Sequence, residues 1–250
     1  MIRFCIVATA RSGTSYLTTA LAGDPMVLCH GEVFHPDVRQ HIAPEYAAAL
    51  DLDLRERNPT AFVDQVYALN GDVHAAGFKI FRGHNDVAMT YILANPEIKK
   101  IVLQRENALA SFSSLLIAIK TGHWQHRPTR VAPPSEDPVQ PEAEPTEPIE
   151  AKVTFDPAAF KTYWDWECKT YDYYRGSIAA AKGDYLELDY VTLTEGNFSS
   201  VERFLELPGG HEWISDIEKL NPRNMLERFY NPCDVLEFAR EWKIEHWLRE

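Results

Sequence analysis

The sequence predicts an α/β fold, a central parallel sheet of about five strands flanked by helices. Three observations lead to this class. Short runs of β-branched and apolar residues recur along the chain, and most are separated by segments with helical spacing of apolar residues. The first run is followed at once by a short polar loop and a helical pattern. Strands that alternate with helices imply parallel pairing with helices on both faces of the sheet.

The strands are expected where apolar runs are short and bounded by polar or turn-forming residues. They are predicted at residues 2–8, 26–29, 75–81, 100–104 and 185–190. A first helix is expected after Gly13, with Gly23 as its C-cap. The other helices are predicted at residues 60–69, 87–94, 108–120, 157–181, 201–207 and 234–248.

A length of 250 residues suits one domain with a full hydrophobic core. Residues 127–151 interrupt the pattern because they are dense in proline and glutamate and lack apolar periodicity. Such a segment cannot supply a core element, so we expect a solvent-exposed insertion. For its two ends, a lid over a substrate pocket stays open as the alternative.

The net charge of −12 argues against general binding to nucleic acid or to an anionic membrane. The four cysteines are scattered and form no C-x-x-C pair, which indicates neither a disulfide framework nor a zinc ribbon. No apolar run reaches the length of a membrane span. We therefore expect a cytoplasmic protein without membrane insertion. The sequence is compatible with a homo-oligomer but does not specify one.

The stretch "ATARSGTS", residues 8–15, joins the first strand to the first helix. A helix N-terminus offers unpaired backbone N–H groups and the positive end of the helix dipole, so it favours an anion. Gly13 allows close approach of the backbone, Thr14 and Ser15 add hydroxyl groups, and Arg11 adds a positive charge. The alternative is a tight turn with an N-capping serine.

The loop differs from the usual nucleotide-binding loop because it lacks the motif G-x-x-x-x-G-K-[ST]. The acidic residue that such proteins have at the end of another strand to bind Mg²⁺ is also missing. Arg105 follows the strand at residues 100–104 instead. Ser113 comes eight residues later, where it can face back toward Arg105 from the next helix. Together they could clasp a second phosphate, which favours a ligand with phosphates at both ends.

These residues resemble two motifs of the sulfotransferases that use 3′-phosphoadenosine 5′-phosphosulfate (PAPS). "ARSGTSY" resembles the loop that holds the 5′-phosphosulfate, and "RENALASFS" resembles the R-x(7)-S motif that holds the 3′-phosphate. A weaker match is "LELDYVTLTEGNFSSVERFLELP", which is similar to a strand-turn-helix segment near the family's C-terminal end. The resemblance is greatest to the bacterial nodulation-factor and glycolipid type, which acts on carbohydrates. The matched residues are Arg11, Ser12, Gly13, Thr14, Ser15, Tyr16, Arg105 and Ser113.

The resemblance implies a sulfotransferase-like domain over residues 1–250, with a P-loop-like phosphosulfate-binding loop after the first strand. PAPS would be the co-substrate, 3′-phosphoadenosine 5′-phosphate (PAP) the product, and no metal would be needed. The chain departs from the family in two places. Arg11 replaces the usual loop lysine, and the glycine-rich C-terminal segment of the animal cytosolic enzymes is missing. The insertion and residues 209–232 lie outside the resemblance.

Sulfuryl transfer needs a cation at the leaving phosphate and a base for the acceptor hydroxyl. Arg11 is the candidate cation. Glu32, beyond the second strand, corresponds in position to the glutamate base of carbohydrate sulfotransferases. His84, beyond the third strand, is the competing base, but it lies a few residues further along than the histidine of the animal enzymes. Glu32 is preferred for this reason.

The expected acceptor is a hydroxyl group of a carbohydrate or a small metabolite, and the sequence does not identify it. The rival function is that of a nucleotide-dependent phosphotransferase, which would bind ATP with Mg²⁺. Tyr16 resembles the family's aromatic residue near the adenine, with an ordinary core position as the alternative.

Four neighbouring side chains could suggest a metal site: Cys29, His30, Glu32 and His35. Their spacing matches no common zinc motif, and adjacent residues of a strand point to opposite faces. We therefore expect no metal at this set of residues.

Overall fold

The computed structural model describes residues 1–36, 41–42, 44–69, 72–125, 151–210, 213–217 and 221–249. They form two compact units: residues 1–106 with 166–214, and residues 107–165 with 215–250. The single domain expected from the sequence stays a prediction. The predicted insertion at 127–151 lies outside the described residues except for Ala151.

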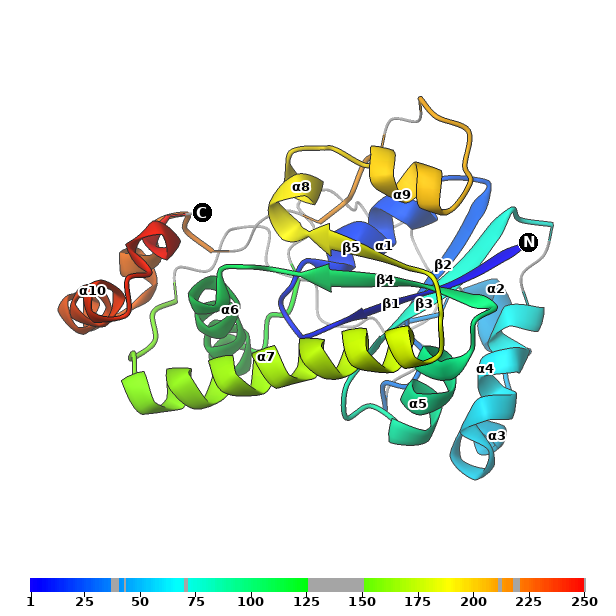
Figure 1. The fold of residues 1–250 in the computed structure, drawn as a ribbon, viewed down its shortest axis with the longest axis horizontal. Coiled ribbons are helices and arrows are strands. Elements are labelled where there is room, and N and C mark those ends of the chain that lie inside the picture. Colours follow the sequence, from blue (N-terminus) through cyan, green and yellow to red (C-terminus); the bar gives the residue numbers. More distant parts are fainter. Residues whose placement is uncertain are drawn as a thin grey trace, which may run out of the picture. The chain divides into compact units, whose positions relative to one another are not determined.

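The first unit contains one parallel sheet of five strands, in the order β2-β3-β1-β4-β5 (Figure 1). Its strands are β1 (Ile2–Ala8), β2 (Val27–Glu32), β3 (Ala75–Phe81), β4 (Ile98–Gln104) and β5 (Tyr185–Asp189). The predicted α/β class with about five strands is thus confirmed. Only β2 differs appreciably from its predicted range: it extends to Glu32, with a register shift against β3 between Cys29 and Glu32.

The predicted helices are present with small changes at their ends. They are α1 (Thr14–Ala22), α4 (Pro59–Ala68), α5 (Asp86–Ala94), α6 (Ala108–Thr121), α7 (Pro157–Ala180), α9 (Ser199–Phe204) and α10 (Pro232–Glu241). The last predicted helix stops at Glu241, and a separate 3-10 helix, η3 (Glu245–Leu248), follows it. Among the described residues, four short helices were not predicted: α2 (Pro44–Ala47), α3 (Leu52–Arg57), α8 (Tyr190–Thr194) and the 3-10 helix η2 (Met225–Arg228).

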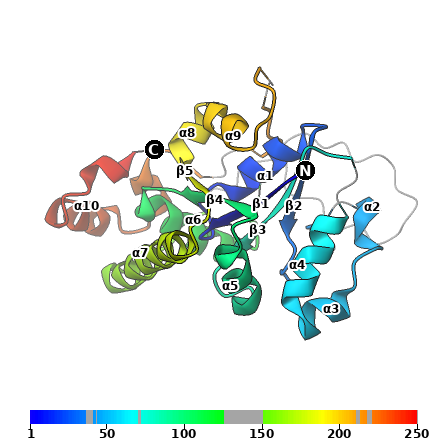
Figure 2. The ribbon, with the colours of Figure 1, turned by 45° about the vertical axis from the view of Figure 1, so that its right-hand side comes forward.

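The central strand β1 is covered on both faces, because its successive side chains point alternately to two cores. Phe4, Ile6 and Ala8 pack with α1, α8 and α9, whereas Cys5 and Val7 pack with α4, α5 and the part of α7 that belongs to this unit. Figure 2 shows these two helical layers on either side of the sheet. This burial on both faces explains why residues 4–8 of β1 are all apolar.

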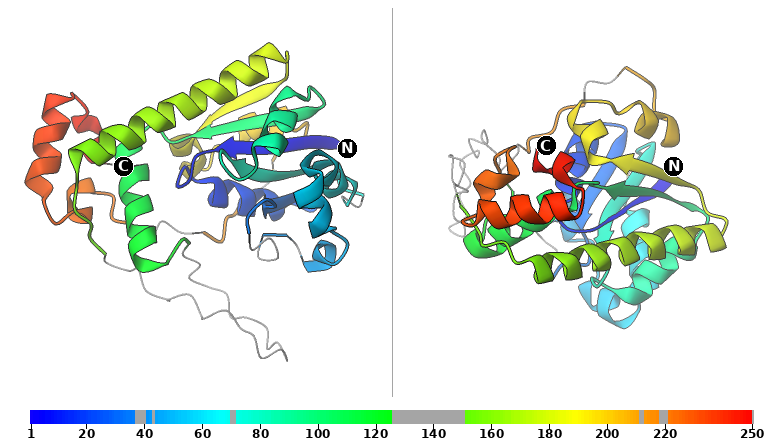
Figure 3. Two further views of the ribbon diagram at one scale, coloured as in Figure 1. Left: turned by 90° about the horizontal axis from the view of Figure 1, so that it is seen from below. Right: turned by 60° about the vertical axis from the view of Figure 1, so that its left-hand side comes forward.

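Helix α7 is bound to the sheet by two buried tyrosines. The Tyr171 hydroxyl donates to the carbonyl oxygen of Leu103 on β4 at 2.8 Å, and the Tyr174 hydroxyl donates to that of Ala8 on β1 at 3.0 Å. Figure 3 shows the C-terminal part of α7, which belongs to this unit, beside the sheet. These bonds satisfy backbone groups where the strands end, so they brace the start of the loop after β1.

The second unit has its own aromatic core. The segments that form it are α6, the chain around Phe155 together with the first turns of α7, and the helices η2, α10 and η3. Its buried residues include Phe112, Phe160, Phe229 and Phe238. Val153 pairs with Phe229 in an isolated β-bridge, which joins the chain before α7 to the chain after η2.

Among the described residues, no helix combines the length and the apolar character that crossing a membrane requires. All four cysteines are free; Cys5 and Cys29 are buried, and Cys168 and Cys233 are exposed.

The substitution Tyr171→Phe tests the bracing by α7. It removes the hydroxyl from a fully buried ring and takes away the hydrogen bond that the Leu103 carbonyl accepts from it. We expect the free energy of unfolding to fall by about 1–3 kcal/mol, measured by urea denaturation. Tyr185→Phe is the matched control, because that ring is 38% exposed and its change should stay within about 0.5 kcal/mol. Equal effects of the two substitutions would contradict the bracing role.

Candidate functional site

The candidate site lies at the carboxyl edge of the sheet. All strands are parallel, so the loop after β1, Glu32 at the end of β2, His84 after β3 and Arg105 after β4 emerge at the same edge. The chain moves from β1 to one side of the sheet for β2 and β3, and to the other side for β4 and β5. Ligands of open α/β sheets bind beside such a change of direction.

The loop after β1 is shaped by two residues with left-handed backbone conformation. Arg11 has φ 68° and Gly13 has φ 93°, and Gly13 is the N-cap of α1. A Cβ atom at position 13 would overlap the Tyr190 ring. Gly13 is therefore required by both its backbone conformation and the adjacent aromatic ring.

The first residues of this loop are held from inside the protein. Ser12 is buried, and its Oγ donates to the carbonyl oxygen of Thr9 at 2.8 Å. The Thr9 Oγ1 donates in turn to Glu167 Oε1 at 2.9 Å. Thr14 is buried as well. The Ser12 hydroxyl thus helps to maintain the loop, and the contact of Ser12 with the ligand stays a prediction.

Lys79 on β3 connects the loop to Glu32. Its side chain is 3% exposed, and Nζ lies 3.0 Å from Glu32 Oε1 and donates to Ser15 Oγ at 3.0 Å. One buried ammonium group therefore contacts both a loop hydroxyl and the carboxylate that the sequence suggested as a base.

Charge and burial oppose each other in this pair. Burial raises the pKa of Glu32, whereas Lys79, His41 and His84 lower it. The lowering outweighs the effect of burial, so the net pKa lies below its ordinary value. Burial lowers the pKa of Lys79 more than Glu32 raises it. At neutral pH Glu32 is consequently an anion, which is the form that accepts a proton.

The two bases proposed from the sequence are neighbours. His84 Nε2 lies 3.7 Å from Glu32 Oε2. Burial lowers the pKa of His84, Glu32 raises it, and His35 and Lys79 lower it, so the net pKa lies below its ordinary value. His84 is thus a largely neutral imidazole at neutral pH.

Arg105 reaches from the end of β4 to the loop. Its Nη1 donates to the carbonyl oxygen of Arg11 at 3.0 Å, and its guanidinium carbon lies 4.5 Å from the centre of the Tyr190 ring. Arg105 is 6% exposed. Tyr190 therefore packs against both the guanidinium of Arg105 and the backbone of Gly13, and it fixes the two relative to each other.

Ser113 belongs to the second unit, whereas Arg105 belongs to the first. Ser113 is buried on α6; its Oγ donates to the carbonyl oxygen of Ala110 at 3.1 Å and accepts from Arg228 Nη1 at 3.1 Å. Arg228 is fully buried and also donates to the carbonyl oxygen of Pro222. The joint action of Arg105 and Ser113 on one phosphate stays a prediction.

Tyr16 lies on the first turn of α1 and stacks on Phe198, with ring centres 6.4 Å apart. It packs against the core around Leu17 and Val201 as a partly buried residue. This contact agrees with the core alternative for Tyr16; the predicted contact with an adenine ring stays a prediction.

Sequence reasoning missed Lys79 and Tyr190. Lys79 is the one charged residue in the run "AAGFKIF", and a lysine inside a buried strand requires a partner. Tyr190 directly follows β5, at the edge where the other site residues lie. The sequence shows both features, but it does not indicate which residues Lys79 and Tyr190 contact.

Gly13→Ala tests the shape of the loop. We expect the substitution to lower the free energy of unfolding by more than about 1 kcal/mol, since it adds both an unfavourable φ and a clash with Tyr190. Gly210→Ala is a matched control: Gly210 has φ 92°, but a Cβ there meets nothing within 4 Å. Urea denaturation measures both, and equal losses would show that Tyr190 does not constrain position 13.

Within the first unit, the structure brings together five of the residues suggested by the sequence: Arg11, Ser15, Glu32, His84 and Arg105. Comparisons of the chain with models of known protein families and with curated proteins gave no match. The function is therefore inferred from the geometry and chemistry of the site itself.

Proposed function

We propose that the protein is a sulfotransferase that uses PAPS and transfers its sulfuryl group to a hydroxyl acceptor. One observation carries the proposal: Lys79 contacts Ser15 of the anion-binding loop and the Glu32 carboxylate at 3.0 Å each. The loop and the candidate base thus belong to one site. A transferase needs this combination, because it must hold an anionic donor and deprotonate an acceptor side by side.

The loop supports binding of a phosphosulfate. It begins the nine-residue helix α1, whose first backbone N–H groups have no partners within the helix. Left-handed residues at positions 11 and 13 are typical of loops that direct successive N–H groups toward an anion. Arg11, Lys79 and Arg105 add positive charge around this loop.

PAPS, when bound, supplies the sulfuryl group and a phosphate leaving group. Glu32 accepts the acceptor's proton as the new bond between sulfur and the acceptor oxygen forms. The bond between sulfur and the phosphate oxygen breaks, and the loop N–H groups, Arg11 and Lys79 stabilise the negative charge that develops on the phosphate. His84 orients the Glu32 carboxylate.

Lys79 couples the two halves of this reaction. In the described state it shares its ammonium group between Glu32 and Ser15. A donor anion at the loop attracts the ammonium group, which weakens its hold on Glu32 and makes the carboxylate a stronger base. The base is thereby activated when the donor is present.

The acceptor is proposed to be a carbohydrate or a small metabolite in the cytoplasm. The net charge of −12 disfavours a polyanionic acceptor because long-range repulsion would slow its approach.

Calorimetry with PAP in a chelating buffer tests donor binding. We expect binding by the wild type, and about 1.5–3 kcal/mol weaker binding, roughly ten- to a hundredfold in Kd, for Arg11→Ala and Arg105→Ala. Arg203→Ala serves as the control, because Arg203 is exposed near the end of α9. If the wild type binds only ATP with Mg²⁺, the protein is a phosphotransferase and the proposal fails.

Glu32→Gln tests the base. Release of PAP from PAPS is measured with a panel of sugars, phenols and alcohols as acceptors. Glu32→Gln should lower kcat roughly 10²–10⁴-fold and leave PAP binding intact, because the amide cannot accept the proton. His84→Gln should reduce kcat less. The reverse order of the two effects would make His84 the base.

A further inference from the structure

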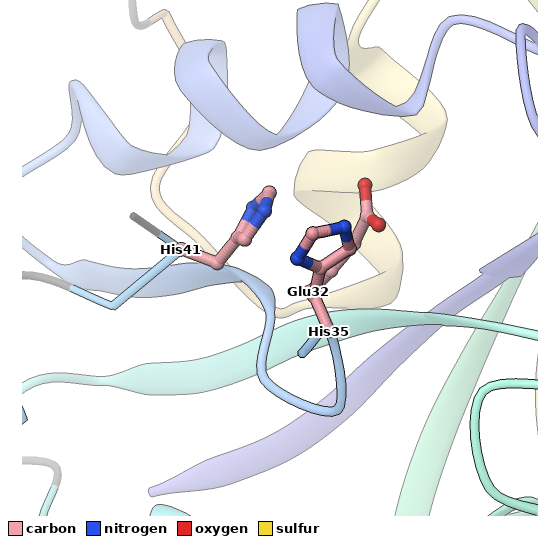
Figure 4. A group of neighbouring side chains, drawn as sticks. All are labelled: Glu32, His35 and His41. Atoms are coloured by element: carbon pink, nitrogen blue, oxygen red, sulfur yellow. The ribbon is translucent and has the colours of Figure 1, made fainter. Parts of the chain in front are cut away.

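Glu32, His35 and His41 form a cluster at the end of β2 and in the loop that follows it. One nitrogen of each imidazole and one Glu32 carboxylate oxygen lie within 4.8 Å of one another (Figure 4). The two imidazole ring centres are 4.7 Å apart. This set differs from the one weighed in the sequence, because it includes His41 and excludes Cys29 and His30.

Backbone contacts hold the three residues in place. The His35 N–H donates to the carbonyl oxygen of Glu32 at 2.8 Å, and the Gly31 N–H donates to that of His41 at 2.6 Å. A Cβ atom on Gly31 would lie 3.0 Å from His41 Nδ1, so a glycine makes room for the ring. Arg55 also donates to the carbonyl oxygen of His35 at 2.9 Å. The backbone around the three residues is therefore held in place before any ion binds.

The donor set matches a transition-metal ion. Two imidazole nitrogens and a carboxylate oxygen are ligands that Zn²⁺ and similar dications prefer, at bond lengths of about 2.0–2.2 Å. Those bonds place neighbouring ligand atoms roughly 3.4 Å apart in a tetrahedral site. The ligand atoms, which lie within 4.8 Å of one another, must therefore approach by up to about 1.4 Å. Rotation about side-chain torsions can supply this, since all three residues are partly exposed.

We propose that Glu32, His35 and His41 bind one divalent first-row transition-metal ion and that this ion inhibits turnover. The ion takes a carboxylate oxygen of Glu32 and competes with Lys79 for the same group. A metal-bound carboxylate no longer accepts the acceptor's proton. The inhibition rests on the proposed function, whereas the binding of the ion does not.

Calorimetry with ZnCl₂ on the chain of 250 residues tests binding, after chelator treatment and transfer to chelator-free buffer. For this experiment Cys168 and Cys233 are replaced by serine in every variant, because exposed thiols would bind zinc independently. We expect one ion per chain, and at least about tenfold weaker binding for His35→Gln and for His41→Gln. His246→Gln, at an exposed histidine of the second unit, should leave the affinity unchanged.

A second measurement needs no variant of the cluster. The chain has nine histidines, and ¹⁵N spectra of their imidazoles with and without Zn²⁺ should show the largest shifts at His35 and His41. Absence of zinc binding, unchanged affinity in both cluster variants, or shifts centred on other histidines would overturn the site.

The same preparations separate this inference from the proposed function. Zn²⁺ should inhibit release of PAP from PAPS in the wild type and should do so far less in His41→Gln. Zinc binding at His35 and His41 without any binding of PAP would support the metal site and refute the sulfotransferase. PAP turnover that zinc bound at these residues leaves unaffected would refute the inhibition.

Discussion

The candidate site depends on one buried cation. Lys79 is almost completely removed from solvent on β3, and an unpaired ammonium group in that position would be costly. Its contacts with Glu32 and Ser15 offset this cost, and they also fix the positions of both partners. The end of β2 and the first turn of α1 are thereby connected through β3. A network of this kind constrains the site because each member requires the others.

The sheet edge around Lys79 is stiffened from two directions. Tyr171 and Tyr174 of α7 bind backbone carbonyls at the ends of β4 and β1, where regular pairing stops. On the other side of the loop, Tyr190 packs against Gly13 and under Arg105. Aromatic residues suit this role since each combines a rigid apolar body with a directional contact. The loop can consequently keep Arg11 in a left-handed conformation that would be unfavourable in isolation.

Glu32 occupies a position where two kinds of chemistry meet. Toward β3 it contacts Lys79, and toward its own loop it approaches His35 and His41. The first environment suits a proton acceptor beside an anionic donor, and the second suits a ligand of a metal ion. The two uses exclude each other because both require the lone pairs of one carboxylate. Under the two proposals, metal availability would therefore control how much of the site can act as a base.

The sequence by itself determined the class of fold and the loop. Apolar runs such as Ile2–Ala8, alternating with helical spacing, specify buried parallel strands, and glycine next to small hydroxyl residues specifies the turn into α1. Only the tertiary structure decided which side chains meet. The partners of Lys79 and Tyr190 lie on distant segments, and the register shift in β2 breaks the alternation from which the orientation of Glu32 and His35 was judged. Local patterns report periodicity and burial, whereas contacts across strand ends depend on strand order and register.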